Sequence, residues 1–155
     1  MVVHPATEAQ CPVAGQTYVL GDPKGPTNLS PGDRLIDGEQ GASISCSVLG
    51  AGPYTFSGAI RATTAQGELV DLEMTDGSIT GETGSVTLSV ATPQLASRFR
   101  STAGGCAVTV LGENIKPGSV WASVACPTIT DPSTPGATCS VGPVSTFVFE
   151  NCDGS

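Results

Sequence analysis

The sequence predicts an all-β fold, a single-domain antiparallel β-sandwich of the jelly-roll or Ig-like kind that disulfides staple together. Three observations predict it. Apolar and polar residues alternate with a period of two along most of the chain from residue 42 onward. Turn-forming residues separate these runs at intervals of roughly 8 to 12 residues, as in sandwich proteins. The six cysteines are an even number, which suits disulfide pairing.

The length of 155 residues fits one domain. We expect residues 1–15 to form a flexible N-terminal leader that Cys11 ties down, and residues 16–155 to form the sandwich. The leader has neither the basic nor the apolar region of a signal peptide. The sequence leaves open whether a lipid anchor precedes it.

A first strand is expected at 16–20, and a short alternating run at 34–37 follows a turn-rich loop over 21–33. That loop holds a match to the N-glycosylation sequon at Asn28. Longer alternating runs are expected to form strands at 42–50, 54–62, 68–75, 84–91, 106–110, 119–126 and 144–152. Turn residues join them at 50–53, 64–67, 75–77, 81–84 and 113–118, and only 92–99 could hold a helical turn.

The alternation also predicts which side chains face the core. In the run 68–75, Val70, Leu72 and Met74 share one face, and Asp71 and Glu73 share the other. The faces expected to point outward are rich in hydroxyl residues: Ser43, Ser45, Ser47, Thr87, Ser89 and Ser145. Such strands resist edge-to-edge pairing less well than strands that carry lysine.

Six basic residues face fourteen acidic ones, which gives a formal net charge of −8. A surface of this sign repels phosphate backbones and anionic lipids, so we expect neither nucleic-acid nor membrane-surface binding. No run of apolar residues is long enough to span a membrane.

The cysteines predict three disulfides, because no CxxC pair suggests a zinc site and the single histidine, His4, lies in the leader. Disulfides in turn predict a secreted, extracellular or cell-envelope location. The six residues are Cys11, Cys46, Cys106, Cys126, Cys139 and Cys152. Of the fifteen connectivities we favour Cys126–Cys139, Cys46–Cys106 and Cys11–Cys152.

No catalytic motif is present, so we expect no enzyme activity, no cofactor and no metal site. The acidic stretch 68–82 offers a minor alternative, a hydrolase that uses a carboxylate pair such as Asp71 and Glu73. The same stretch fails as an EF-hand, because Asp76 stands where that loop needs glycine.

The function predicted is therefore binding or adhesion, with a glycan, a surface polymer or a protein as ligand. Trp121 is the only tryptophan and alternates with core positions, so it should face outward and serve as an anchor. Tyr54 and the pair Arg98 and Arg100 are further candidate ligand residues. One alternative is a structural subunit that self-associates into a surface assembly. A minor one is a secreted inhibitor that presents the loop 127–138.

Overall fold

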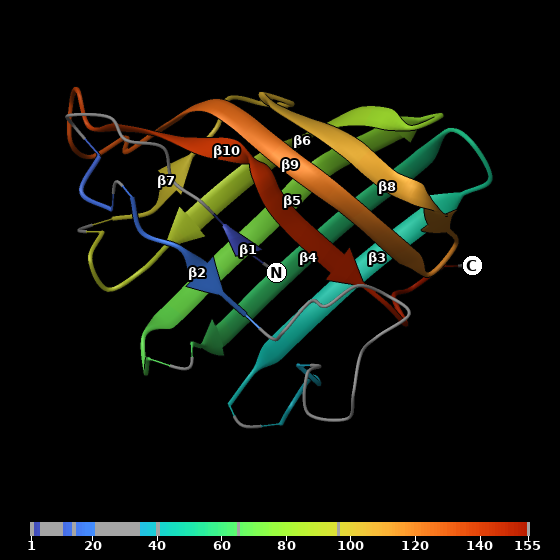
Figure 1. The fold of residues 1–155 in the computed structure, drawn as a ribbon, viewed down its shortest axis with the longest axis horizontal. Helices are drawn as coiled ribbons and strands as arrows, with labels where there is room; N and C mark the ends of the chain where they lie inside the picture. Colours follow the sequence, from blue (N-terminus) through green and yellow to red (C-terminus); the bar gives the residue numbers. More distant parts are fainter. Residues whose placement is uncertain are drawn as a thin grey trace.

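A computed structural model describes residues 2–3, 11–13, 15–20, 35–39, 41–64, 66–95 and 97–154. Every regular element among these residues is a β-strand and no helix occurs, which confirms the all-β prediction (Figure 1). Asn28, His4 and the loop 21–33 lie outside the described residues. The strands are β1 (Val2–Val3), β2 (Tyr18–Val19), β3 (Ser43–Gly50), β4 (Tyr54–Thr63), β5 (Leu69–Thr80), β6 (Thr83–Ala91), β7 (Phe99–Arg100), β8 (Cys106–Lys116), β9 (Ser119–Thr130) and β10 (Thr138–Phe149).

All the strands belong to one antiparallel sheet, in the order β2-β1-β10-β9-β7-β6-β5-β4-β3, and β8 pairs with both β6 and β9. From β3 to β10 the chain therefore runs back and forth between neighbouring positions, which is a meander. Jelly rolls and Ig-like domains use Greek-key connections instead. The predicted jelly-roll or Ig-like topology is thus not what the described strands show.

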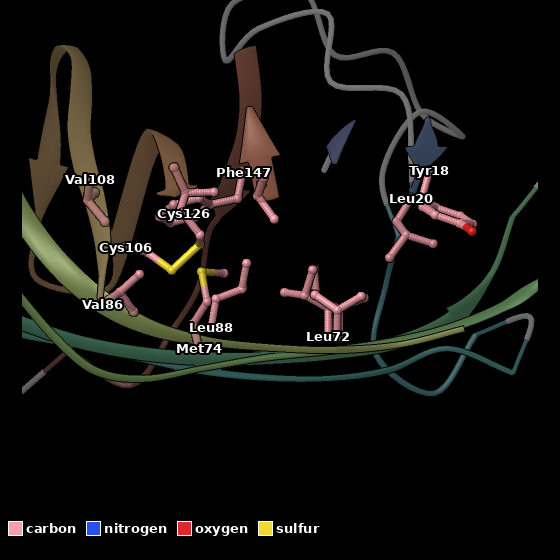
Figure 2. Close-up of a cluster of buried hydrophobic side chains, with 14 of the residues drawn as sticks. Tyr18, Leu20, Leu72, Met74, Val86, Leu88, Cys106, Val108, Cys126 and Phe147 are labelled. Atoms are coloured by element: carbon pink, nitrogen blue, oxygen red, sulfur yellow. A yellow bond between two sulfur atoms is a disulfide. The ribbon is translucent and has the colours of Figure 1, made fainter. Parts of the chain in front are cut away.

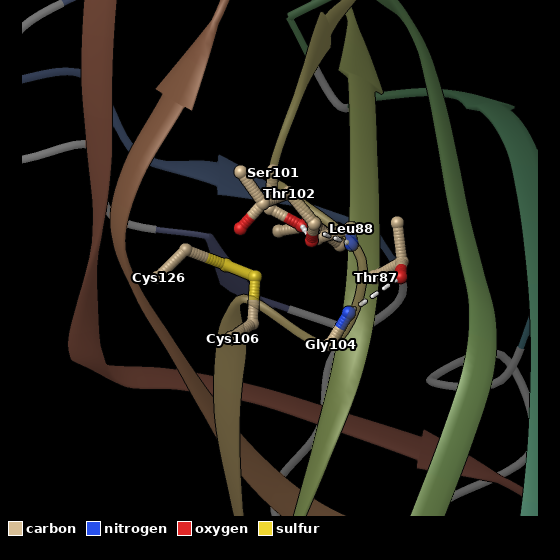
Figure 3. Close-up of a disulfide and its surroundings, with 7 residues drawn as sticks. All are labelled: Thr87, Leu88, Ser101, Thr102, Gly104, Cys106 and Cys126. Carbon is tan, nitrogen blue, oxygen red and sulfur yellow. Dashed lines mark hydrogen bonds between the residues drawn. A yellow bond between two sulfur atoms is a disulfide. The ribbon is translucent and has the colours of Figure 1, made fainter.

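The strands β7 and β8 are two parts of one interrupted strand that lies between β6 and β9. Phe99 of β7 pairs with Val90, and Cys106 of β8 pairs with Val86 on the same neighbour. Between them the chain leaves the ladder, and the Gly104 amide donates a hydrogen bond to Thr87 Oγ1 at 2.9 Å (Figure 3).

This crossing corrects one prediction about the outward faces. Thr87 and Ser89 are buried in the structure, and Ser145 of β10 has no exposed surface. Thr87 accepts a hydrogen bond from the Gly104 amide, and Ser89 accepts one from Arg98 Nη1, so residues of and next to the interrupted strand contact both. Ser145 shares the inward face of β10 with Phe147 and Phe149. The period-two pattern alone does not show which of its faces another segment covers.

The core lies between the β3–β6 half of the sheet and the β8–β10 half. Figure 2 shows Leu72, Met74 and Leu88 projecting from β5 and β6 toward Phe147 and the Cys106–Cys126 disulfide. All of them are almost completely buried, as the alternation predicted for Leu72 and Met74. Burial of each such side chain contributes roughly 1.5–3 kcal/mol to folding.

The predicted turn at 75–77 is wrong, because β5 continues through these residues to Thr80. The ladders on both sides of β5 change register here, between Phe56 and Gly58 and between Thr75 and Ser78. Asp76 takes a φ of 55°, a left-handed conformation that Asp tolerates, so the Asp-Gly pair forms a β-bulge rather than a hairpin. Residues 92–95 form a hydrogen-bonded turn and not a helix.

The structure confirms three disulfides but not the predicted pairs, which are instead Cys11–Cys139, Cys46–Cys152 and Cys106–Cys126. Strand register explains the correction. Because Ala107 pairs with Ala125, Cys106 lies directly across from Cys126. The Cα atoms of the two cysteines are 4.2 Å apart. Cys139 instead pairs with Ile129, three residues along β9 from Cys126, which is roughly 10 Å and too far for a disulfide.

The other two disulfides attach chain ends to the sheet. Cys11–Cys139 joins the N-terminal region to β10, and Cys46–Cys152 joins the C-terminal residues to β3. In the described part of the chain, no helix is long and apolar enough to cross a membrane. Three disulfides are compatible with an extracellular location.

Neighbouring segments cover much of the edge strand β3. The backbone N–H of Val48 donates to Asp153 O at 2.8 Å, and the amide of Gly118 donates to Val48 O at 3.1 Å. At the other end of the strand, the Ile44 amide donates to Asp37 Oδ1 at 2.7 Å. Covered groups of this kind are not available to pair with another strand.

Candidate functional site

Trp121 lies on the outward face of β9, as its position in the alternation predicted. Its neighbours Val120 and Ala122 are buried, whereas Trp121 is half-buried. In the register of the sheet it lies directly opposite Val148 of β10, which is also half-buried. The indole and an aliphatic side chain thus share one apolar position on the surface.

A row of hydroxyl side chains crosses the sheet two residues farther along β9. Ser123 pairs with Thr109 of β8 on one side and with Thr146 of β10 on the other. Thr109 is exposed, and Ser123 and Thr146 are half-buried. Three adjacent strands spread these hydroxyls over roughly 10 Å. The Ser123 hydroxyl donates to Thr109 O at 3.4 Å, which leaves its oxygen as an acceptor. A threonine hydroxyl can both donate and accept hydrogen bonds.

A third row consists of small side chains. Ala125 of β9 is half-buried and lies opposite Ala107 of β8, which is exposed. We call the three rows together the Trp121 platform; its members are Trp121, Val148, Thr109, Ser123, Thr146, Ala107 and Ala125. These side chains carry no charge, although the chain carries a net charge of −8. Opposite Trp121 the ladder between β8 and β9 is irregular from Val110 to Ile115, and Glu113 falls within this stretch. Beyond Trp121, Ser119 pairs with Lys116 of β8, so charged residues lie next to the platform on this side.

Arg98 and Arg100 lie elsewhere: Arg98 directly precedes β7, and Arg100 is its last residue. Arg98 Nη2 is 2.7 Å from Asp71 Oδ2, and its Nη1 is 3.5 Å from Glu73 Oε2. The guanidinium also donates to Ser89 Oγ at 3.3 Å. Arg98 is therefore engaged within the protein, and it joins the two carboxylates that sequence reasoning had considered for hydrolysis.

Arg100 is exposed and pairs with Thr130, nine residues along β9 from Trp121. That separation is roughly 30 Å in an extended strand. Tyr54 is half-buried at the start of β4, where it packs against the core. The four predicted ligand residues therefore do not form one site.

A cleft of about 910 Å³ opens between β3–β5 and residues 148–153. Ile44, Ile60 and Phe149 line it, together with Glu73. Its described lining does not include Asp71. Across the described residues, no group of three or more His, Cys, Asp or Glu side chains could hold a metal ion.

Asp131 organises the loop between β9 and β10. Its Oδ1 accepts hydrogen bonds from the Ser133 amide and the Ser133 hydroxyl, both at 2.7 Å. The hydroxyls of Ser97 and Ser133 hold the pKa of Asp131 well below its usual range, because they stabilise the carboxylate. The carboxylate is buried, while residues 132–136 of the loop are exposed.

The sequence indicated Trp121 as a candidate ligand residue but did not indicate its neighbours in the platform. Thr109, Ser123 and Thr146 alternate with core residues, so their outward direction was readable from the chain. Their position beside Trp121 was not, because it depends on the register between strands. The chain matches no protein-family model, and it matches no curated protein and no solved structure in the comparisons made.

Proposed function

We propose that this protein is a non-enzymatic binding domain of the extracellular space or cell envelope, and that it engages its ligand through the Trp121 platform. The observation that carries the proposal is the outward position of the only tryptophan, next to uncharged side chains of β8, β9 and β10. Aromatic side chains supply large contact areas at low entropic cost and are enriched at binding sites. We also propose that the two packed halves of the sheet act as the layers of a sandwich that supports this surface.

The experiment is a binding screen against arrays of glycans and of extracellular proteins, with wild type and two variants. Trp121→Ala should fold and lose its ligand, because the anchor is removed. Leu49→Ala is the control, since Leu49 is an exposed large apolar residue that lies on β3, away from the platform. A ligand that Trp121→Ala binds as tightly as wild type would contradict the proposal.

Self-association into an assembly is the alternative function, and the edges of the sheet support it less. Asp153, Gly118 and Asp37 cover parts of β3. At the other end of the sheet, β2 has only two residues. Covered and very short edges are the features by which proteins avoid edge-to-edge association.

A further inference from the structure

We infer that the ligand of the Trp121 platform is a neutral, linear polysaccharide whose chain lies along the direction of β9. This inference rests on the proposed function and names the ligand class. Three properties of the platform support it: its charge, the order of its rows and its length.

A platform without charged side chains lacks the partners that a charged ligand needs. None of the described side chains of the platform is acidic or basic. An anionic glycan or a phosphorylated ligand would find no cation within the three rows, because Lys116 lies in the next row beyond Trp121 and Glu113 lies in the irregular stretch of β8. The net charge of −8 would also repel it. Neutral sugars need no such partner.

The order of the rows matches the two kinds of surface on a sugar ring. A pyranose presents C–H groups on its faces and hydroxyl groups around its edge. Trp121 and Val148 offer an apolar surface to a ring face. Thr109 and Thr146 offer hydroxyls that can donate and accept, as sugar hydroxyls do. Ser123, whose hydroxyl donates to Thr109 O, offers an acceptor.

The length of the platform sets the size of the ligand. From Trp121 to Ala125 the backbone advances four residues, roughly 13 Å, which accommodates more than one sugar unit. Ala107 and Ala125 form the far row, and their small side chains leave room for a second or third unit. A surface of roughly 10 by 13 Å is much smaller than the roughly 800 Å² that each partner buries in a typical protein–protein interface, which favours the narrower ligand.

The test uses neutral gluco- and manno-oligosaccharides of one to six units, with polygalacturonate as the anionic comparison. Because Trp121 is the only tryptophan, intrinsic fluorescence reports directly on the platform. We expect the affinity to rise by about tenfold or more from one unit to three, and then to level off. Binding should change little with salt, since no ion pair contributes.

Two variants test where the oligosaccharide lies on the platform. Ala125→Lys places a long side chain in the third row and should remove the gain from the second and third units. Thr55→Lys is the control, because Thr55 is an exposed strand residue of β4. Equal binding of short and long oligosaccharides, or no effect of Ala125→Lys, would overturn the inference.

The outcomes separate this inference from the proposed function. If no neutral oligosaccharide binds but another ligand binds in a Trp121-dependent way, the inference fails and the proposed function stands. If no ligand depends on Trp121, both fail. Preference for polygalacturonate overturns the inference alone.

Discussion

At the scale of single residues, a few side chains fix conformations that their neighbours then depend on. Asp131 closes a turn by accepting two hydrogen bonds from Ser133, and its own amide donates to Ala137 O at 3.2 Å. Gly58 leaves space in β4 that the ring of Phe149 occupies. Asp131 therefore holds the conformation of the loop between β9 and β10, and Gly58 allows the Phe149 ring to pack against β4.

Asp131→Asn should make the free energy of unfolding depend less on pH in the acidic range. The carboxylate has a depressed pKa in the folded state, so its stabilising effect is complete above its ordinary pKa of 3.8 and declines as the pH falls below it. Through this group, wild type should therefore lose stability as the pH falls below about 4, whereas the variant should not. Urea midpoints measured for both proteins at neutral and acidic pH test this. Parallel pH profiles would contradict it.

Gly58→Ala should destabilise the fold by about 1–3 kcal/mol, as overpacking of a core does. A Cβ at position 58 would lie 2.5 Å from Cζ of the buried Phe149 ring. Urea unfolding measures the effect. The double variant Gly58→Ala with Phe149→Leu is the control, since a smaller side chain should recover part of the loss. A single variant as stable as wild type would show that the ring does not need this space.

At the scale of elements, strand register decides which cysteines meet. Cys106 and Cys126 are cross-strand neighbours in β8 and β9, whereas Cys46 reaches Cys152 because the C-terminal residues run beside β3. The same contact covers the edge of β3. One disulfide therefore joins the two strands of the β8–β9 hairpin, and the other two attach the ends of the chain to β10 and β3.

Disulfide mapping should recover these three pairs. Trypsin together with a protease that cleaves before Asp and Glu separates all six cysteines in the unreduced, denatured protein. We expect linked peptides that contain Cys11 with Cys139, Cys46 with Cys152, and Cys106 with Cys126. A peptide that links Cys126 to Cys139 would contradict the register of β9 and β10.

The stability lost when a disulfide is removed should increase with the length of the loop that the disulfide closes. On chain-entropy grounds, loss of Cys106–Cys126, with a separation of 20 residues, should cost about 3 kcal/mol. Loss of Cys11–Cys139, with a separation of 128, should cost about 5 kcal/mol. Paired Cys→Ala variants compared by urea unfolding check the order, and the reverse order would count against the entropic account.

At the scale of the whole molecule, one curled meander supplies both the core and the proposed binding surface. The inward faces of the two halves bury the apolar residues, and the outward face of β8–β10 carries the Trp121 platform. On the other half, Arg98 joins Asp71 and Glu73 on the outward side of β5. The two outward surfaces therefore differ in charge, although both follow the same alternation.

The protein should be a monomer of 15.5 kDa in light scattering over a wide range of concentration. The reasons are the covered edge of β3, the two-residue β2 and the repulsion between copies that each carry a charge of −8. Measurements at low and high salt separate the charge from the edges. A stable oligomer at moderate concentration would favour the self-assembly alternative.

The sequence by itself determined the positions of most of the longer strands, the direction of most of their side chains and the presence of three disulfides. These features depend on local chemistry: period-two alternation, turn residues and an even number of cysteines. Only the tertiary structure decided the meander order, the bulge at 75–77, the disulfide pairs and the neighbours of Trp121. Each of these depends on the register between strands that are distant along the chain, and alternation within one strand carries no information about that register.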